Sequence, residues 1–152
     1  MTYKGKFRPK NRAKYKGDFE NITYRSLWER NCFRFVDEHP DVLKWGSEIV
    51  IVPYRCKTDG RMHRYFTDLY IEFKSGQIYL IEIKPAKETT PPKPPKNGRK
   101  TARFIKEVMT YAKNCSKWES AEKYCKERNY IFEIWTENSL KSLGIQILKG
   151  SK

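Results

Sequence analysis

The sequence contains no long apolar run. None of its stretches approaches the ~18 consecutive apolar residues that a membrane-spanning helix needs, and the N-terminus lacks the apolar segment of a signal peptide. We therefore expect a soluble, intracellular protein with no membrane partner. A chain of 152 residues suits one domain with a single core.

Cysteine and histidine are also scarce. The four cysteines show no Cys-x-x-Cys spacing, and the two histidines, His39 and His63, are isolated in the chain. Neither a zinc site nor a disulfide framework is expected, and the cysteines are expected to be free buried thiols. No serine or cysteine nucleophile motif accompanies the histidines, so histidine-based catalysis has little support.

Acidic residues are too few to balance the basic ones. The chain carries 32 Lys and Arg against 18 Asp and Glu, a net charge of +14. Two segments hold all of this excess, because residues 1–16 carry seven bases and no acid, and residues 84–106 carry eight bases and one acid. Localised positive charge indicates a polyanion partner, most often nucleic acid, although a basic segment can also be a solubilising arm.

Both basic segments are predicted to pack poorly. Residues 1–20 are expected to form a flexible arm that orders on binding, and residues 85–98, with five prolines, a mobile loop of polyproline character. Such segments suit contacts with the DNA backbone better than sequence readout. The bases expected to contact DNA are Lys4, Lys6, Arg8, Lys10, Arg12, Lys87, Lys93, Lys96, Arg99, Lys100 and Arg103.

Residues 21–148 are predicted to form one α/β domain. Apolar residues at helical spacing predict helices over 23–38 and 99–128, the second broken near residue 114. Runs rich in β-branched and aromatic residues predict strands over 48–55, 64–73, 77–84 and 130–136. A short helix over 138–143 and a small edge strand over 145–148 follow. This order predicts a three-strand antiparallel meander and a further strand in a mixed sheet flanked by helices.

Asp68 and Glu82 are predicted to face each other across the hairpin between the second and third strands. A three-residue loop ending at Gly76 opposes the two acids on one face, and glycine suits the left-handed position at the end of such a loop. A two-residue loop would instead send Glu82 to the other face. Lys84 shares the face of Glu82 by the two-residue alternation of a strand.

Two carboxylates and a lysine at one end of a sheet suit a metal-dependent phosphodiesterase. The carboxylates bind a divalent cation, and the ammonium lies beside the attacked phosphate. A second Glu-x-Lys, Glu72 to Lys74, lies about 13 Å along the strand from Asp68 and cannot share a cation with it. The alternative interpretation is a structural salt bridge of Lys84 at the strand end.

Glu29 has two interpretations. Ser26 and Glu29 have the spacing of a capping box, in which the glutamate bonds back to the start of its own helix. If the helix instead begins at Thr23, Glu29 lies in the second turn and can point at the sheet as a further acid of the site.

These positions resemble the PD-(D/E)XK nuclease superfamily. The matching residues are Glu29, Asp68 and Glu82-Ile83-Lys84, with Thr67 where the family name has proline. The resemblance implies a restriction-endonuclease-like core and Mg²⁺, for which Mn²⁺ can substitute. The implied ligands are Asp68, Glu82 and the backbone carbonyl of Ile83, with Glu29 helping directly or through water. Lys84 would orient the attacking water or neutralise charge on the phosphate.

A wider resemblance covers nearly the whole chain. Residues 24–29, 45–48, 64–68 and 81–85 resemble the small head-completion nucleases of T-even-type bacteriophages. This implies a DNA nuclease, endonuclease rather than exonuclease, that acts late in head assembly after DNA packaging. Its partners would be DNA and the head, portal or neck proteins, and it would occupy the host-cell cytoplasm and then the virion.

The sequence is compatible with several alternatives. The Glu, Asp, Glu-x-Lys order also resembles the nuclease subunit of Tn7-type transposons. A structural head-closure protein that binds DNA or the portal without cutting is a further alternative. The sequence does not decide whether two copies form a homodimer to cut both strands.

Overall fold

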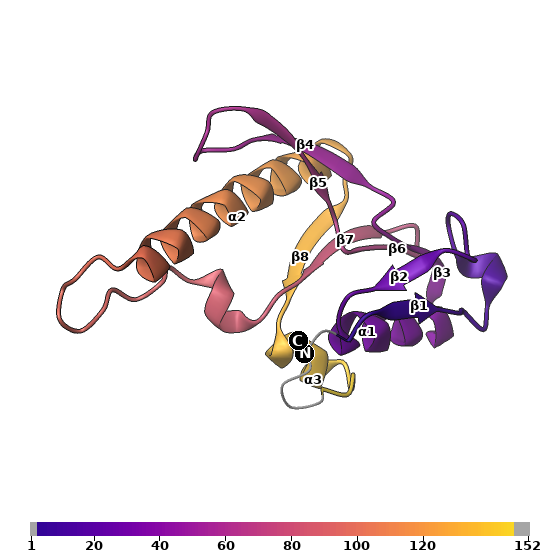
Figure 1. Cartoon of the computed structure of the whole chain (residues 1–152). Helices are drawn as coiled ribbons and strands as arrows, with labels where there is room; N and C mark the ends of the chain where they lie inside the picture. The colour runs from indigo at the N-terminus through magenta and orange to yellow at the C-terminus, as the bar shows by residue number, and fades with distance from the viewer. Residues whose placement is uncertain (1–2, 148–152) are drawn as a thin grey trace.

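A computed structural model describes residues 3–147 and contains a four-stranded mixed sheet of order β3-β6-β7-β8. Strand β6 (Leu69–Phe73) pairs antiparallel with β3 (Val42–Ser47) on one side and with β7 (Ile78–Ile83) on the other. Strand β8 (Ile131–Trp135) pairs with β7 in parallel. Helices α1 (Leu27–Glu38) and α2 (Ala102–Glu127) cover opposite faces (Figure 1). The predicted fold class, a meander plus one strand flanked by helices, is confirmed.

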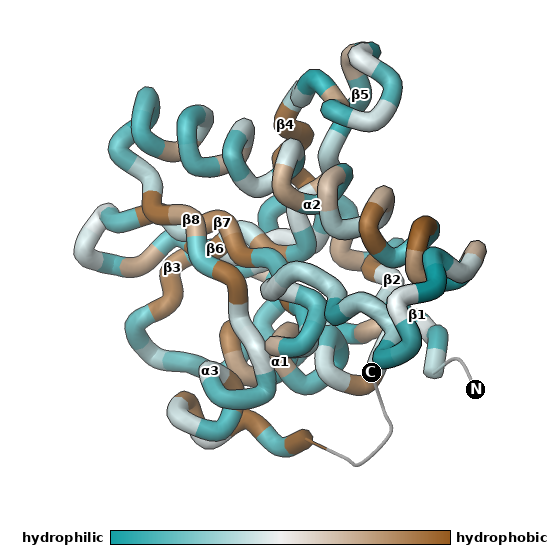
Figure 2. The backbone as a smooth tube through the Cα atoms, turned by 90° about the vertical axis from the view of Figure 1, so that its left-hand side faces the viewer, coloured by the Kyte–Doolittle hydropathy of each residue, from teal (hydrophilic) through white to brown (hydrophobic). Residues whose placement is uncertain are grey.

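Alternate residues of the central strands build two cores. Leu69 and Ile81 pack with the α1 residues, whereas Tyr70 and Leu80 pack with the α2 residues. Strand β7 is paired on both edges and covered on both faces, which explains why its first four residues are nearly all apolar. Figure 2 shows hydrophobic segments on the central strands and hydrophilic turns around them.

The hairpin between β6 and β7 has the predicted register. Leu69 pairs with Ile81 and Glu72 with Ile78, which is the register that a three-residue loop produces. Gly76, at the end of the loop, has φ +94°, a left-handed conformation that glycine adopts without steric cost. The same register places Asp68, directly before β6, opposite Glu82.

Two predicted strands are wrong in their extent. The edge strand of the main sheet is β3, which was not predicted. The predicted strand over 48–55 instead forms β4 (Ile51–Arg55), and β4 pairs with β5 (Met62–Phe66) in a separate hairpin. The chain turns out of the sheet at Glu48, whose φ is +55°. The predicted strand over 64–73 is likewise two strands, β5 and β6, divided at residues 67–68.

The N-terminal segment is packed, which corrects the expectation of an arm without structure. Strand β1 (Gly5–Phe7) pairs with β2 (Ile22–Tyr24), and a 3₁₀ turn, η1 (Arg12–Lys14), lies between them. The Phe7 ring meets that of Trp45 edge-on at 5.8 Å between centroids. The backbone N–H groups of Lys10 and Asn11 donate to the carboxylate of Asp37. Aromatic residues spaced between the bases give this segment an apolar side.

The C-terminal half follows the predictions more closely. Helix α2 is continuous through residue 114, where a break was predicted, and α3 (Glu137–Ser142) matches the predicted short helix. A 3₁₀ turn, η2 (Ala86–Thr89), precedes an extended Pro-rich loop that projects from the body in Figure 1. Residues 145–147 form no strand, and residue 148 lies outside the described residues. No helix within residues 3–147 is long and apolar enough to cross a membrane.

Candidate active site

The structure brings Asp68, Glu82 and Lys84 together where β6 begins and β7 ends. The backbone N–H of Ile83 donates to Oδ2 of Asp68 at 2.7 Å. The Lys84 Nζ atom lies 3.6 Å from Oε1 of Glu82. The second Glu-x-Lys copy is placed elsewhere, since Glu72 sits near the loop end of β6. The three residues therefore lie at the same end of the β6–β7 hairpin.

Glu82 is buried and has a partner that the sequence did not reveal. Glu82 is 7% exposed, and its Oε2 atom accepts a hydrogen bond from the hydroxyl of Tyr65, a buried residue of β5. Burial, reinforced by the charge of Glu82, raises the pKa of Tyr65 far above its ordinary value, so this hydroxyl stays protonated and donates. One oxygen of Glu82 thus meets Tyr65 and the other faces Lys84.

Glu29 takes part in the cap of helix α1, and its side chain is buried. Helix α1 begins at Leu27, and Ser26 caps it by accepting a hydrogen bond from the backbone N–H of Glu29 at 3.1 Å. The Ser26 hydroxyl also lies 3.4 Å from the Glu29 carboxylate, as its hydrogen-bond donor. Glu29 is nevertheless 6% exposed and faces inward. The helix start at residue 23 is wrong, because residues 22–24 form β2.

Arg25 lies near Glu48, Glu29 and Asp68. It forms an ion pair with Glu48, the residue with the left-handed backbone, and this hydrogen bond is the main reason why the pKa of Arg25 is raised. The charges of Glu29 and Asp68 raise the same pKa further. These two carboxylates, from α1 and from the start of β6, therefore lie near one guanidinium.

Helix α2 contributes a lysine that was not predicted. The Lys117 Nζ atom lies 5.5 Å from the centroid of the Tyr65 ring. Burial lowers the pKa of Lys117, while the negative charges of Glu82 and Asp68 act in the opposite direction. The positive charge of Lys84 also lowers the pKa of Lys117. Lys84 and Lys117, from different elements, therefore approach the same pair of carboxylates.

The donor set at this site fits a hard divalent cation. Asp68 and Glu82 are both carboxylates, and their Oδ2 and Oε2 atoms accept hydrogen bonds from the Ile83 backbone and the Tyr65 hydroxyl. With the backbone carbonyl of Ile83, they offer only oxygen ligands, which Mg²⁺ and Mn²⁺ prefer over nitrogen or sulfur. Glu29 does not join them in a close group of three acids, because no such group among residues 3–147 contains it.

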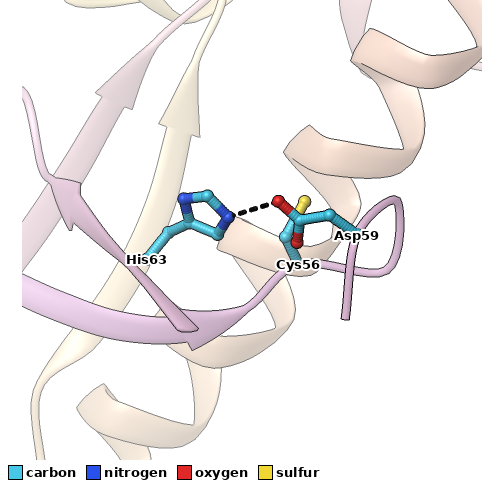
Figure 3. Close-up of side chains that lie close together, drawn as sticks. All are labelled: Cys56, Asp59 and His63. Carbon is cyan, nitrogen blue, oxygen red and sulfur yellow. Dashed lines mark hydrogen bonds and ion pairs between the residues drawn. The ribbon is translucent and has the colours of Figure 1, made fainter. Parts of the chain in front are cut away.

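A second cluster, at the β4–β5 turn, contradicts the expectation that His63 is isolated. The ligand atoms of Cys56, Asp59 and His63 lie within 4.8 Å of one another, close enough to hold one metal ion (Figure 3). The Nε2 atom of His63 lies 2.7 Å from Asp59, and the Cys56 thiol lies 3.0 Å from the hydroxyl of Thr58. Each member thus has a partner within the turn, and these contacts stabilise the turn.

The eleven predicted DNA-contacting bases are all exposed, and the two segments that carry them lie on opposite sides of the molecule in Figure 1. Lys6, Arg8 and Lys10 line a groove of about 290 Å³ between β1 and α1. Arg30 and Arg34 of α1 line it as well, and neither was predicted. The buried Nε atom of Arg30 has no hydrogen-bond partner among the described residues. The helical pattern of the sequence did not indicate that Arg30 and Arg34 line this groove.

A mixed sheet with two acids and a lysine at the ends of neighbouring strands defines a nuclease with a restriction-endonuclease-like fold. The model of the family described as "TnsA-like endonuclease N terminal" matches residues 39–137, a range that includes Asp68, Glu82 and Lys84 but not Glu29. The chain is also 43% identical over 148 residues to the head completion nuclease of Enterobacteria phage T4, covering 96% of this chain and 99% of that protein. The chain belongs to the TnsA-like endonuclease family.

It is therefore a nuclease that acts on DNA, as the sequence predicted. Nucleases of this fold use a divalent metal ion.

Proposed function

We propose that this chain is a Mg²⁺-dependent DNA endonuclease, with Mn²⁺ as a working substitute, that acts in phage head completion after DNA packaging. The observation that carries the catalytic part is the opposition of Asp68 and Glu82 across the β6–β7 register, with Lys84 Nζ 3.6 Å from Glu82. An ion pair alone would need one acid, whereas cation binding uses both.

Asp68, Glu82 and the backbone carbonyl of Ile83 would hold the cation. When bound there, a divalent ion supplies Lewis-acid activation of the scissile phosphate and of the attacking water. Glu29 would assist through water, which agrees with its burial beside the site and with its absence from a close group of acids. Its capping contact with Ser26 fixes the side chain at the start of α1.

Lys84 would orient the attacking water or stabilise the charge that develops on the phosphate oxygens. Its position directly after β7 keeps Nζ beside the Glu82 carboxylate, where the phosphate is expected. Lys117 would add a second positive charge from the α2 side. Attack of water in line with the bond between phosphorus and O3′ would break that bond and leave a 5′-phosphate and a 3′-hydroxyl, the products that the family resemblance implies.

The exposed bases would bind the DNA backbone without reading sequence. The groove between β1 and α1 would receive phosphates on one side of the molecule, and the Pro-rich loop would receive them on the other. Arg30 and Arg34 strengthen this proposal, because a fixed helix holds them beside the N-terminal bases.

The assembly role is supported by the name of the phage T4 relative, head completion nuclease, and by its near-complete coverage. We propose that the chain works in the host-cell cytoplasm during assembly and then stays at the head or neck of the virion. Its partners there would be head, portal or neck proteins.

Plasmid cleavage tests the catalytic proposal. A covalently closed circle has no ends, so only an endonuclease can cut it. We expect cutting with Mg²⁺ or Mn²⁺ and none with Ca²⁺. Lys84→Ala should slow cutting by about 100-fold or more, in the range seen when a charge-stabilising donor is removed. Lys74→Ala, in the second Glu-x-Lys copy, is the matched control and should cut at the wild-type rate. Equal rates for the two variants would contradict the assignment of the catalytic lysine to Lys84, at the end of β7.

Phage complementation tests the assembly role. Phage that lacks its own head completion nuclease should regain infectivity with the wild-type chain and fail with Asp68→Asn. If particles made with Asp68→Asn are infectious, cutting is dispensable and the chain acts as a structural head-closure protein.

A further inference from the structure

We infer that Tyr65 is a positioning residue of the nuclease site, which holds the Glu82 carboxylate in the orientation that binds the cation. This inference rests on the proposed function. Tyr65 would not touch DNA or the metal ion itself. It would act through the hydrogen bond from its hydroxyl to Oε2 of Glu82.

The first argument is the burial of Glu82. A carboxylate that is 7% exposed needs hydrogen-bond partners, because removing a charge from water without compensation costs several kcal/mol. Tyr65 satisfies one oxygen, so the other oxygen points to the side of Lys84. A residue that bonds to a metal ligand in this way fixes the orientation of that ligand.

The second argument is the rigidity of Tyr65. It is 3% exposed and pairs with Val52 across the β4–β5 hairpin. Its ring belongs to the core that includes Cys125 of α2, and Lys117 lies over it. The hydroxyl is therefore fixed by a hairpin and a helix that do not belong to the main sheet.

The neighbouring Tyr70 provides a matched comparison. It is also 3% exposed, belongs to the same core, and donates a hydrogen bond of 3.0 Å to a carboxylate. That carboxylate is Glu72, near the loop end of β6 and outside the proposed site. Replacing either tyrosine with phenylalanine removes one buried hydroxyl, but only the change at Tyr65 alters a proposed metal ligand.

The experiment measures Mn²⁺ binding to the full chain by titration calorimetry without DNA. Tyr65→Phe should weaken binding about 10- to 100-fold, the usual effect of losing a group that orients a ligand. Tyr70→Phe should bind Mn²⁺ as the wild type does. Thermal melting of both variants separates this effect from a general loss of stability, because both lose a similar hydrogen bond.

Cleavage adds a second measurement. For Tyr65→Phe, the Mg²⁺ concentration for half-maximal cutting should rise while saturating Mg²⁺ restores most of the rate. The rate of Lys84→Ala should not recover in this way. A structural role alone would change stability without moving the metal dependence.

Several results would overturn the inference. Unchanged or tighter Mn²⁺ binding in Tyr65→Phe, with normal binding in the wild type, would overturn it and leave the proposed function intact. Equal weakening in Tyr65→Phe and Tyr70→Phe would assign the effect to general loosening of the core. If Mn²⁺ binds equally to the wild type and to Asp68→Asn, the proposed metal site is wrong and the role of Tyr65 falls with it.

Discussion

The backbone N–H of Ile83 donates a hydrogen bond of 2.7 Å to the carboxylate of Asp68. Asp68 lies at the junction between β5 and β6, so this hydrogen bond links that junction to the backbone of β7. The carboxylate is therefore positioned by the backbone of the strand that carries Glu82. The register of the β6–β7 hairpin sets where the backbones of these two acids lie.

Separate variants should distinguish the two roles at the start of α1. Glu29→Gln keeps the backbone N–H that donates to Ser26 but loses the anion, so we expect slower plasmid cleavage with a melting temperature close to that of the wild type. Ser26→Ala removes the cap, costs about 1 kcal/mol and should lower the melting temperature with less effect on cleavage. If Glu29→Gln melts early and cuts normally, Glu29 is only a capping residue.

Lys117→Met should slow DNA cleavage without lowering the melting temperature. The positive charge of Lys117 faces Glu82 and Asp68, but burial opposes that charge and lowers its pKa. Methionine fills similar volume without a buried charge, so stability should be kept. Lys113→Met, at an exposed position one turn earlier in α2, is the control and should cut normally. Equal cleavage rates for the two variants would contradict a role for Lys117.

The groove between β1 and α1 predicts a DNA-binding effect of Arg34. Arg34→Ala should reduce DNA affinity for all sequences alike, measured with Ca²⁺ present so that no cleavage occurs. The slope of log affinity against log salt should fall by about 0.9 for each phosphate that the variant no longer neutralises. Lys126→Ala, on the last turn of α2, removes the same charge away from the groove. A salt slope that stays at the wild-type value for Arg34→Ala would exclude the groove from the DNA path.

The Pro-rich loop gives a parallel prediction. Replacing Lys93, Lys96, Arg99 and Lys100 with alanine should weaken DNA binding and lower its salt slope. The melting temperature should stay the same, because all four side chains are exposed. Filter binding over a range of salt concentrations and a melting curve measure the two quantities. A drop in stability with unchanged affinity would show that the loop supports the fold instead.

The sequence predicted the part of the site that local rules control. Gly76 in a three-residue loop specifies the hairpin register, and that register opposes Asp68 and Glu82. The apolar run of β7 indicated a buried central strand, so the charged residues at its end were conspicuous. Where local chemistry determines geometry, the prediction and the structure agree.

The remaining features depend on tertiary contacts. Strand β3 contains Lys44 and Gly46 and lacks a clear alternation, so only its pairing with β6 identifies it as a strand. The high net charge of the N-terminal segment led to the prediction of a flexible arm, although Phe7 and Tyr15 pack against Trp45. Tyr65 and Lys117 could not be assigned, because their relation to Glu82 arises only when the β4–β5 hairpin and α2 fold over the sheet.

That hairpin has a consequence for local opening. Strands β4 and β5 form a two-stranded sheet of their own, and their contacts with α2 hold them in place. Sub-global unfolding of such a unit needs less free energy than unfolding of the central sheet. If Tyr65 orients Glu82, detachment of the hairpin would switch off catalysis while most of the molecule stays folded.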